Sequence, residues 1–206
     1  MTKLIVLILL LASAAAVGQK DTPGEYIHAS LLQGKKRSLI GWSGREHSFT
    51  MDMAARSVKP SDLPEFVNID GLIVQSTLLP VPQGIDLRHL NPSREKDLLT
   101  KYMKDELDYY RKKLREKYSQ SESEPLTIKG RVFLLWYFDM PENNKMIKRQ
   151  VYLSTLFFDH VMDLNIPIFE VNDFARARSL LVKMAGSLKT YNKHVDLALL
   201  SRQLNK

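Results

Sequence analysis

The side chains best suited to metal binding or acid–base chemistry are the five histidines, which are His28, His47, His89, His160 and His194. None lies four residues from another, the spacing that places two imidazoles on one face of a helix for zinc. Glu46 precedes His47 and Asp159 precedes His160, but adjacent residues on a strand point to opposite faces. The chain also has no cysteine. We therefore expect no metal site and no cofactor.

Hydrolytic chemistry would need a nucleophile turn or a converging pair of carboxylates. The segment Gly41-Trp42-Ser43-Gly44 lacks the Gly-x-Ser-x-Gly spacing of a nucleophile elbow. The carboxylates of this region are scattered, and they include Asp52, Asp62, Glu65, Asp70 and Asp86. A glycosidase needs two carboxyl groups at a defined separation, which spacing along the chain does not reveal. We assign no catalytic residue and keep a hydrolase as the alternative.

Aromatic side chains concentrate in two apolar runs, Arg131–Asp139 and Lys148–Phe158. A sheet that is covered on both faces would use these rings as its core. Alternatively, one face stays open as an apolar groove for a ligand or a partner segment. In that case Trp136, Met140 and Tyr152 are the predicted binding residues.

The first residues, Met1–Gly18, have the pattern of a secretory signal peptide. Lys3 supplies the positive charge, Leu4–Leu11 is continuously apolar, and Ala12–Val17 contains small residues. Cleavage is expected before Val17 or before Gln19, and we prefer Gln19 because polar sequence begins there. The apolar run is shorter than the roughly 20 residues of a spanning helix, and no cysteine follows it for lipid attachment.

The predicted product is a single α/β domain, residues 19–206, with no transmembrane segment after cleavage. Its predicted location is the periplasm or the cell exterior. A disulfide-free domain of this size must rely on packing for its stability.

The chain is basic, with a formal net charge of +7. Its cations cluster at Lys35–Arg37, Arg111–Lys117 and Lys145–Arg149. Such clusters in an exported protein suit anionic envelope surfaces or acidic partners, and we expect no nucleic acid. The alternative is a solvated basic face. Lys112 and Lys113 are the candidate residues for contact with an anionic surface.

The elements that must position these residues follow from periodicity and turn signals. Asp70-Gly71 between two β-rich runs predicts a hairpin, because both residues tolerate the positive φ angles of a type I′ turn. An apolar stripe from Leu99 to Tyr118 predicts a long helix that begins at Pro92, and Ser119–Pro125 is expected to be a link. The remaining predicted elements are strands at Arg131–Asp139, Lys148–Phe158 and Asp159–Phe169, a long helix from Asn172 or Asp173 to Tyr191, and a short helix within Val195–Leu204.

This order of elements, with Gly130–Phe138 and Ala185–Lys189, resembles the PsbP/Mog1-like group, which includes DcrB-like periplasmic proteins. The resemblance covers mainly Phe66–Tyr191. It implies an α+β fold in which an antiparallel sheet is flanked by two long helices, a Mog1p/PsbP-like sandwich. It also implies an accessory or binding role without a shared catalytic signature. We therefore expect an exported, non-enzymatic binding or accessory protein whose partner is an unknown protein or envelope component. The alternative is a hydrolase acting on a cell-envelope polymer.

Overall fold

A computed structural model describes residues 25, 27–53, 55–61, 66–81, 85, 87, 90–114, 121–141, 144, 146–170 and 173–206. The predicted signal peptide, Met1–Gly18, lies outside these residues. No helix in the described part of the chain is long and apolar enough to cross a membrane.

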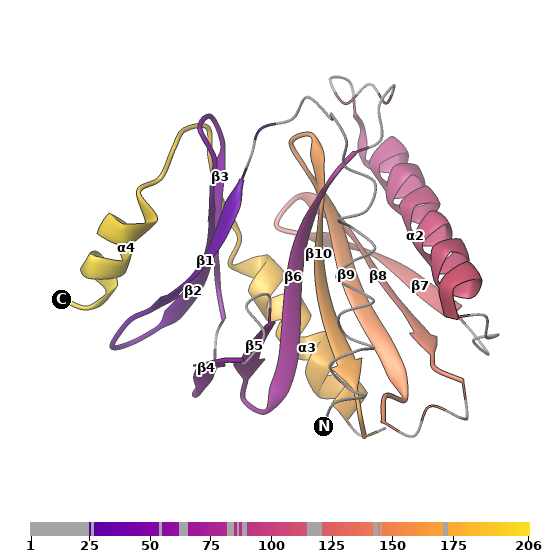
Figure 1. Cartoon of the computed structure of the whole chain (residues 1–206). Coiled ribbons are helices and arrows are strands. Elements are labelled where there is room, and N and C mark those ends of the chain that lie inside the picture. Colours follow the sequence, from indigo (N-terminus) through magenta and orange to yellow (C-terminus); the bar gives the residue numbers. More distant parts are fainter. Residues whose placement is uncertain are drawn as a thin grey trace.

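Two antiparallel sheets carry the fold (Figure 1). The larger sheet has seven strands in the order β4-β5-β6-β10-β9-β8-β7. Its strands are β4 (Val58–Pro60), β5 (Phe66–Ile69), β6 (Leu72–Pro80), β7 (Ser121–Ile128), β8 (Arg131–Asp139), β9 (Arg149–Phe157) and β10 (His160–Ile168).

The smaller sheet has four strands in the order β1-β2-β3-β11. Its strands are β1 (His28–Gln33), β2 (Ser38–Ser43), β3 (Ser48–Asp52) and β11 (Lys189–Tyr191). The last of these pairs with β3 and so ties the C-terminal part of the chain to the N-terminal hairpins.

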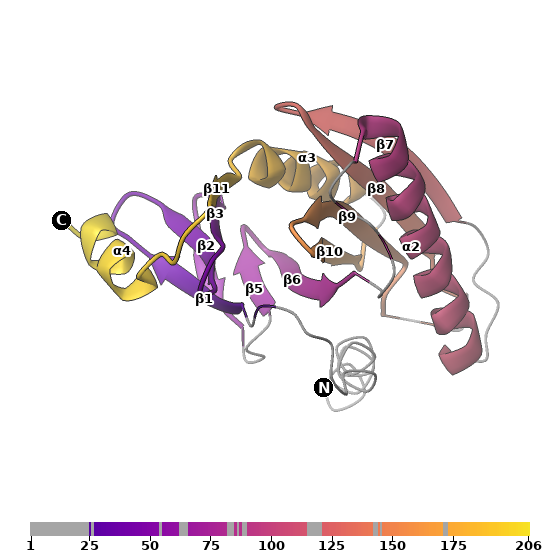
Figure 2. The same cartoon turned by 90° about the horizontal axis from the view of Figure 1, so that it is seen from above.

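Helices cover both faces of the larger sheet (Figure 2). Helix α2 (Pro92–Leu114) packs on β8 and β9, and α3 (Asp173–Gly186) packs on β9 and β10 from the opposite side. Helix α4 (Leu197–Leu204) lies on β1 and β2 of the smaller sheet.

The two faces of the larger sheet lie in different cores. Strand side chains alternate between faces, so Trp136 and Phe138 pack with Leu99 and Leu107 of α2. Phe133 on the other face packs in a larger core with α3, and this core also contains residues of the smaller sheet. Strand β8 is therefore apolar on both faces because both faces are covered.

The structure confirms the α+β class, the antiparallel pairing and several predicted elements. The hairpin turn at Asp70 and Gly71 has φ angles of 50° and 89°, as a type I′ turn needs. Strands β8, β9 and β10 match the three predicted strands closely. Asp196 caps the short terminal helix by accepting a hydrogen bond from the Leu199 amide.

Other expectations need correction. We expected a single sheet flanked by two long helices, but the structure has two sheets. Only α2, with 23 residues, is a long helix, and α3 has 14 residues. The second predicted helix ends at Gly186, because the chain turns there and Lys189–Tyr191 joins the smaller sheet as β11. The predicted link Ser119–Pro125 overlaps the edge strand β7, where a proline is tolerated.

Candidate functional site

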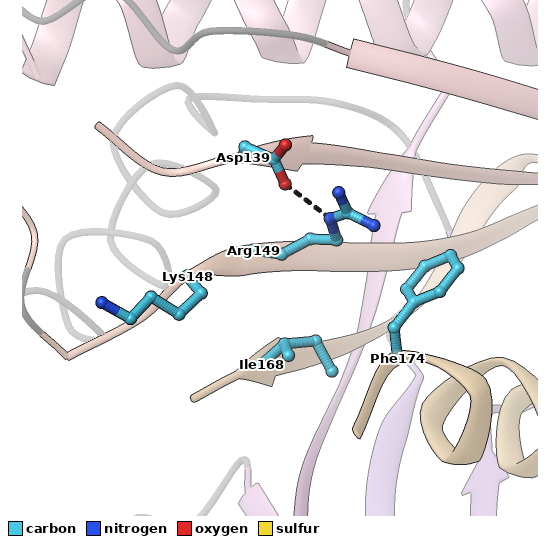
Figure 3. Close-up of a pocket in the computed structure, with 5 residues that line it drawn as sticks. All are labelled: Asp139, Lys148, Arg149, Ile168 and Phe174. Atoms are coloured by element: carbon cyan, nitrogen blue, oxygen red, sulfur yellow. Dashed lines mark hydrogen bonds and ion pairs between the residues drawn. The ribbon is translucent and has the colours of Figure 1, made fainter. Parts of the chain in front are cut away.

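A pocket of about 210 Å³ opens beside β8, β9 and β10, next to the start of α3 (Figure 3). Its lining combines one acid, two cations, one aliphatic and one aromatic side chain: Asp139, Lys148, Arg149, Ile168 and Phe174. Apart from Phe174, these residues lie at the ends of strands or directly beside them.

Backbone pairing brings these residues together. Asp139 and Arg149 are direct partners across β8 and β9. The amide of Lys148 donates to the carbonyl of Ile168 at 2.7 Å, and the amide of Met140 donates to the carbonyl of Lys148 at 2.9 Å. Met140, a predicted binding residue, is thus buried next to the pocket but is not part of its lining.

Arg149 is the central side chain of the pocket. Its Nε donates to Asp139 Oδ1 at 2.5 Å. Its guanidinium carbon lies 4.4 Å from the ring centre of Tyr137 and 4.9 Å from that of Phe174. Cation–π contacts of this kind hold the guanidinium plane in place. The hydrogen bond to Asp139 raises the pKa of Arg149 further above its usual value, so the group stays charged.

The two terminal nitrogens of Arg149 have no hydrogen-bond acceptor among the described residues, and in Figure 3 only Nε is joined to Asp139. A guanidinium with two free N–H groups can bind a carboxylate or phosphate through two parallel hydrogen bonds. Lys148 beside it is exposed and has no ion-pair partner in the described part of the chain. The pocket is therefore equipped to hold an anionic group.

The predicted binding residues Trp136 and Tyr152 lie under α2, away from this pocket. Their rings stack at 4.0 Å with an interplanar angle of 9°. Their exposed fractions are 0% and 5%, so they form core and not an open groove in this structure. Binding at these two residues stays a prediction.

A buried polar cluster lies beside Trp136. Asp163 on β10 accepts hydrogen bonds from Tyr102 of α2 and from Ser154 of β9. Trp136 Nε1 donates to Ser154 Oγ at 2.8 Å. Burial raises the pKa of Asp163 to about 6, although the two hydroxyl donors act in the opposite direction.

Two further groups of α2 extend this cluster. Glu106 is partly buried, and desolvation together with the charge of Asp163 raises its pKa to about 7. The Tyr110 hydroxyl lies 3.1 Å from the Tyr152 hydroxyl, and burial raises the pKa of both tyrosines. The cluster joins helix to sheet by hydrogen bonds, and the Asp163 side chain is buried within it.

Lys112 is exposed on the last turn of α2. Lys113 belongs to the same helix, but its side chain is outside the described part of the structure. Among the described residues, these lysines do not lie at the pocket.

The histidines form local pairs. His160 does contact Asp159, at 2.6 Å, because Asp159 lies in the turn and not on the strand. His47 pairs at 2.8 Å with Glu25 and not with the adjacent Glu46. No group of three metal-ligating side chains occurs among the described residues.

Sequence reasoning did not identify Asp139, Arg149 and Phe174 as a site. Arg149 was noted only as the end of the basic cluster Lys145–Arg149. The sequence pattern that could have indicated the site is a charged residue at the adjoining ends of two paired apolar strands, Asp139 on β8 and Arg149 on β9. However, the contact with Phe174 depends on where α3 packs, which local sequence does not encode.

No protein-family model matches the chain, and no curated protein matches its sequence significantly. Among solved structures, the chain is similar to the solution structure of cyanobacterial PsbP (CyanoP) from Synechocystis sp. PCC 6803. The TM-score is 0.41, the identity is 12%, and the match covers 85% of this chain and 99% of that chain. The expected resemblance was to the PsbP/Mog1-like group, and this match is to a PsbP protein. At this TM-score the match carries no conclusion about function.

Proposed function

We propose that the chain is an exported, non-enzymatic binding or accessory protein that holds a carboxylate or phosphate group of its partner at Arg149. The observation that carries this proposal is the guanidinium of Arg149. Its terminal nitrogens have no described acceptor, while Tyr137 and Phe174 keep its plane in place. A fixed guanidinium loses little conformational freedom when it binds an anion.

The volume of the pocket indicates the size of the bound group. About 210 Å³ is less than the roughly 300–1,000 Å³ of pockets that enclose whole small molecules. One acidic side chain, a chain-terminal carboxylate or a single phosphate group would fit. A protein partner that inserts one such group would match an accessory role.

Export rests on the composition of Met1–Gly18 alone. If the segment is a cleaved signal, the protein recovered outside the cytoplasm will begin at Gln19 or at Val17. N-terminal sequencing of that protein will distinguish the two cleavage sites. Recovery of the chain only in the cytoplasm with Met1 retained would contradict export.

Binding at the pocket is tested by titrating isotope-labelled protein with glutarate, with inorganic phosphate and with neutral glutaramide. We expect saturable amide shifts at Asp139, Arg149 and Phe174 with the two anions and none with glutaramide. Replacing Lys148 with Met should weaken binding several-fold, because the charge is lost while the chain length is kept. The matched control is Lys112→Met on α2. Equal shifts with glutaramide would refute the proposal.

The hydrolase alternative would need two carboxyl groups that face a common cleft. Asp163 is buried between α2 and the sheet, and Glu25 is the described carboxylate that pairs with His47. No observation on the described residues favours this alternative over binding.

A further inference from the structure

The β1–β2 turn and the C-terminal end of α4 form one continuous surface. Neither segment contributes a residue to the lining of the pocket. The Lys35 amide donates to the Leu204 carbonyl at 3.2 Å, and Asn205 Nδ2 donates to the Gln33 carbonyl at 2.9 Å. Figure 1 shows this end of the molecule beside the label C. We call it the α4 surface and define it by Lys35, Lys36, Arg37, Leu199 and Arg202.

The fold holds the α4 surface in place. The inner side of α4 packs Leu197 against Leu32 and Leu39, with Leu200 and Leu204 beside them. Gly34 makes the contact possible, because a Cβ atom there would lie 2.6 Å from Leu204 Cβ. The outer side of the helix is therefore presented in a fixed orientation.

The α4 surface combines positive charge with an exposed apolar side chain. Lys35, Lys36 and Arg202 are exposed and have no ion-pair partner among the described residues, while Arg37 lies 3.9 Å from Asp52. Leu199 is 47% exposed, one of the two large hydrophobic side chains that are exposed in the described chain. It lies three residues from Arg202, which places both on one face of the helix.

We propose that the α4 surface docks the protein on a membrane whose headgroups are anionic, with Leu199 entering the headgroup layer. The exposed Lys35, Lys36 and Arg202, with Arg37 beside them, attract an anionic lipid surface at about five-fold in affinity per charge. Flexible lysines without a shaped acceptor site suit diffuse negative charge, whereas the fixed guanidinium of Arg149 suits one discrete anion. A single leucine adds a contribution that does not depend on salt.

The position of α4 also supplies an internal control. Both views show α4 and α2 at opposite sides of the molecule (Figures 1 and 2). The exposed Lys96 on α2 can therefore be reversed in charge without touching the α4 surface. A variant at Lys96 measures the effect of overall net charge alone.

The test is sedimentation of the full chain with phosphatidylglycerol–phosphatidylcholine vesicles and with phosphatidylcholine vesicles. The double variant Lys35→Glu/Lys36→Glu should lower the partition coefficient on anionic vesicles by about 25-fold or more. Leu199→Ser should lower it several-fold and leave its salt dependence unchanged. Lys96→Glu should have little effect. All variants keep the same N-terminal segment, so differences between variants report the substituted side chains alone.

Three outcomes would overturn the proposal. They are unchanged binding of the double variant to anionic vesicles, equal losses in Lys96→Glu and in the double variant, and retention on poly-glutamate without binding to anionic vesicles. The last would assign the surface to an acidic protein. The substituted side chains are exposed, and an unchanged circular dichroism spectrum verifies that each variant is folded.

Discussion

The hydroxyl of Tyr102 on α2 donates a hydrogen bond to the carboxylate of Asp163 on β10. Ser154 on β9 donates a second one, and Trp136 on β8 donates to Ser154. One buried polar cluster thus links the long helix to three strands of the larger sheet. At its centre is a carboxyl group whose pKa burial raises to about 6.

This carboxyl group makes stability depend on pH. The folded state keeps the proton of Asp163 up to about pH 6, whereas an unshifted carboxyl loses it near pH 3.8. Stability should therefore fall as pH rises from about 4 to about 6, by up to about 3 kcal/mol in total. Glu106, with its pKa raised to about 7, extends this loss toward neutral pH.

Urea unfolding between pH 4 and pH 8 measures this dependence. Asp163→Asn keeps the size of the side chain but removes its titration. The stability of this variant should therefore fall much less as pH rises. The exposed Asp97→Asn variant should keep the wild-type slope. An unchanged slope in Asp163→Asn would show that this carboxyl group does not control the pH dependence.

Tyr102→Phe removes one of the two donors to Asp163. A hydrogen bond to a charged group contributes about 1.5–3 kcal/mol, so the free energy of unfolding should fall by about that amount at pH 8. The loss should be smaller at pH 5, where Asp163 is protonated in the folded state. Tyr191→Phe is the control, because its hydroxyl has no described partner. Equal losses at both pH values would contradict a role for the carboxylate.

The properties of residues that are close in the sequence predicted several elements correctly. The turn at Asp70-Gly71 depends on two adjacent residues that tolerate positive φ, and the hairpin formed as expected. Strand β8 was recognised because an apolar run on both faces requires cover on both sides. In each case the controlling interactions lie within a few residues of one another.

Pairing between strands that are far apart in the sequence could not be predicted. Strand β10 pairs with β6, which places Asp163 opposite Thr77, and the sequence of β10 gives no sign of this partner. The smaller sheet gains its fourth strand only because β11 returns to pair with β3. Strand β7 was missed because serines and Pro125 suggest a link, although an edge strand accepts them.

Arg149→Lys tests the geometry of the proposed anion site. Lysine keeps the charge but lacks the planar fork, so it can neither stack on Tyr137 and Phe174 nor offer two parallel N–H groups. Affinity for glutarate should fall about ten-fold or more, measured by amide shifts in a titration. Arg178→Lys, on α3 and paired with Glu124 of β7, should leave affinity unchanged. Equal affinity in Arg149→Lys and wild type would mean that charge alone determines binding.

Gly34→Ala tests how α4 is held on the smaller sheet. The new methyl group would lie 2.6 Å from Leu204 Cβ and 2.7 Å from the Leu204 carbonyl oxygen, so the last turn of α4 must shift. Overpacking of this kind costs about 1–3 kcal/mol. Amide exchange in Leu197–Leu204 should become faster while exchange in α2 stays the same.

Gly186→Ala at the end of α3 is the matched control, because the nearest atom to its Cβ is 3.8 Å away. That variant should be neutral or slightly more stable, since alanine favours a helix over glycine by about 1 kcal/mol. If Gly34→Ala also leaves amide exchange in α4 unchanged, the helix is not held by its contact with the β1–β2 turn. The α4 surface would then lack its fixed orientation, and membrane binding would have to depend on charge alone.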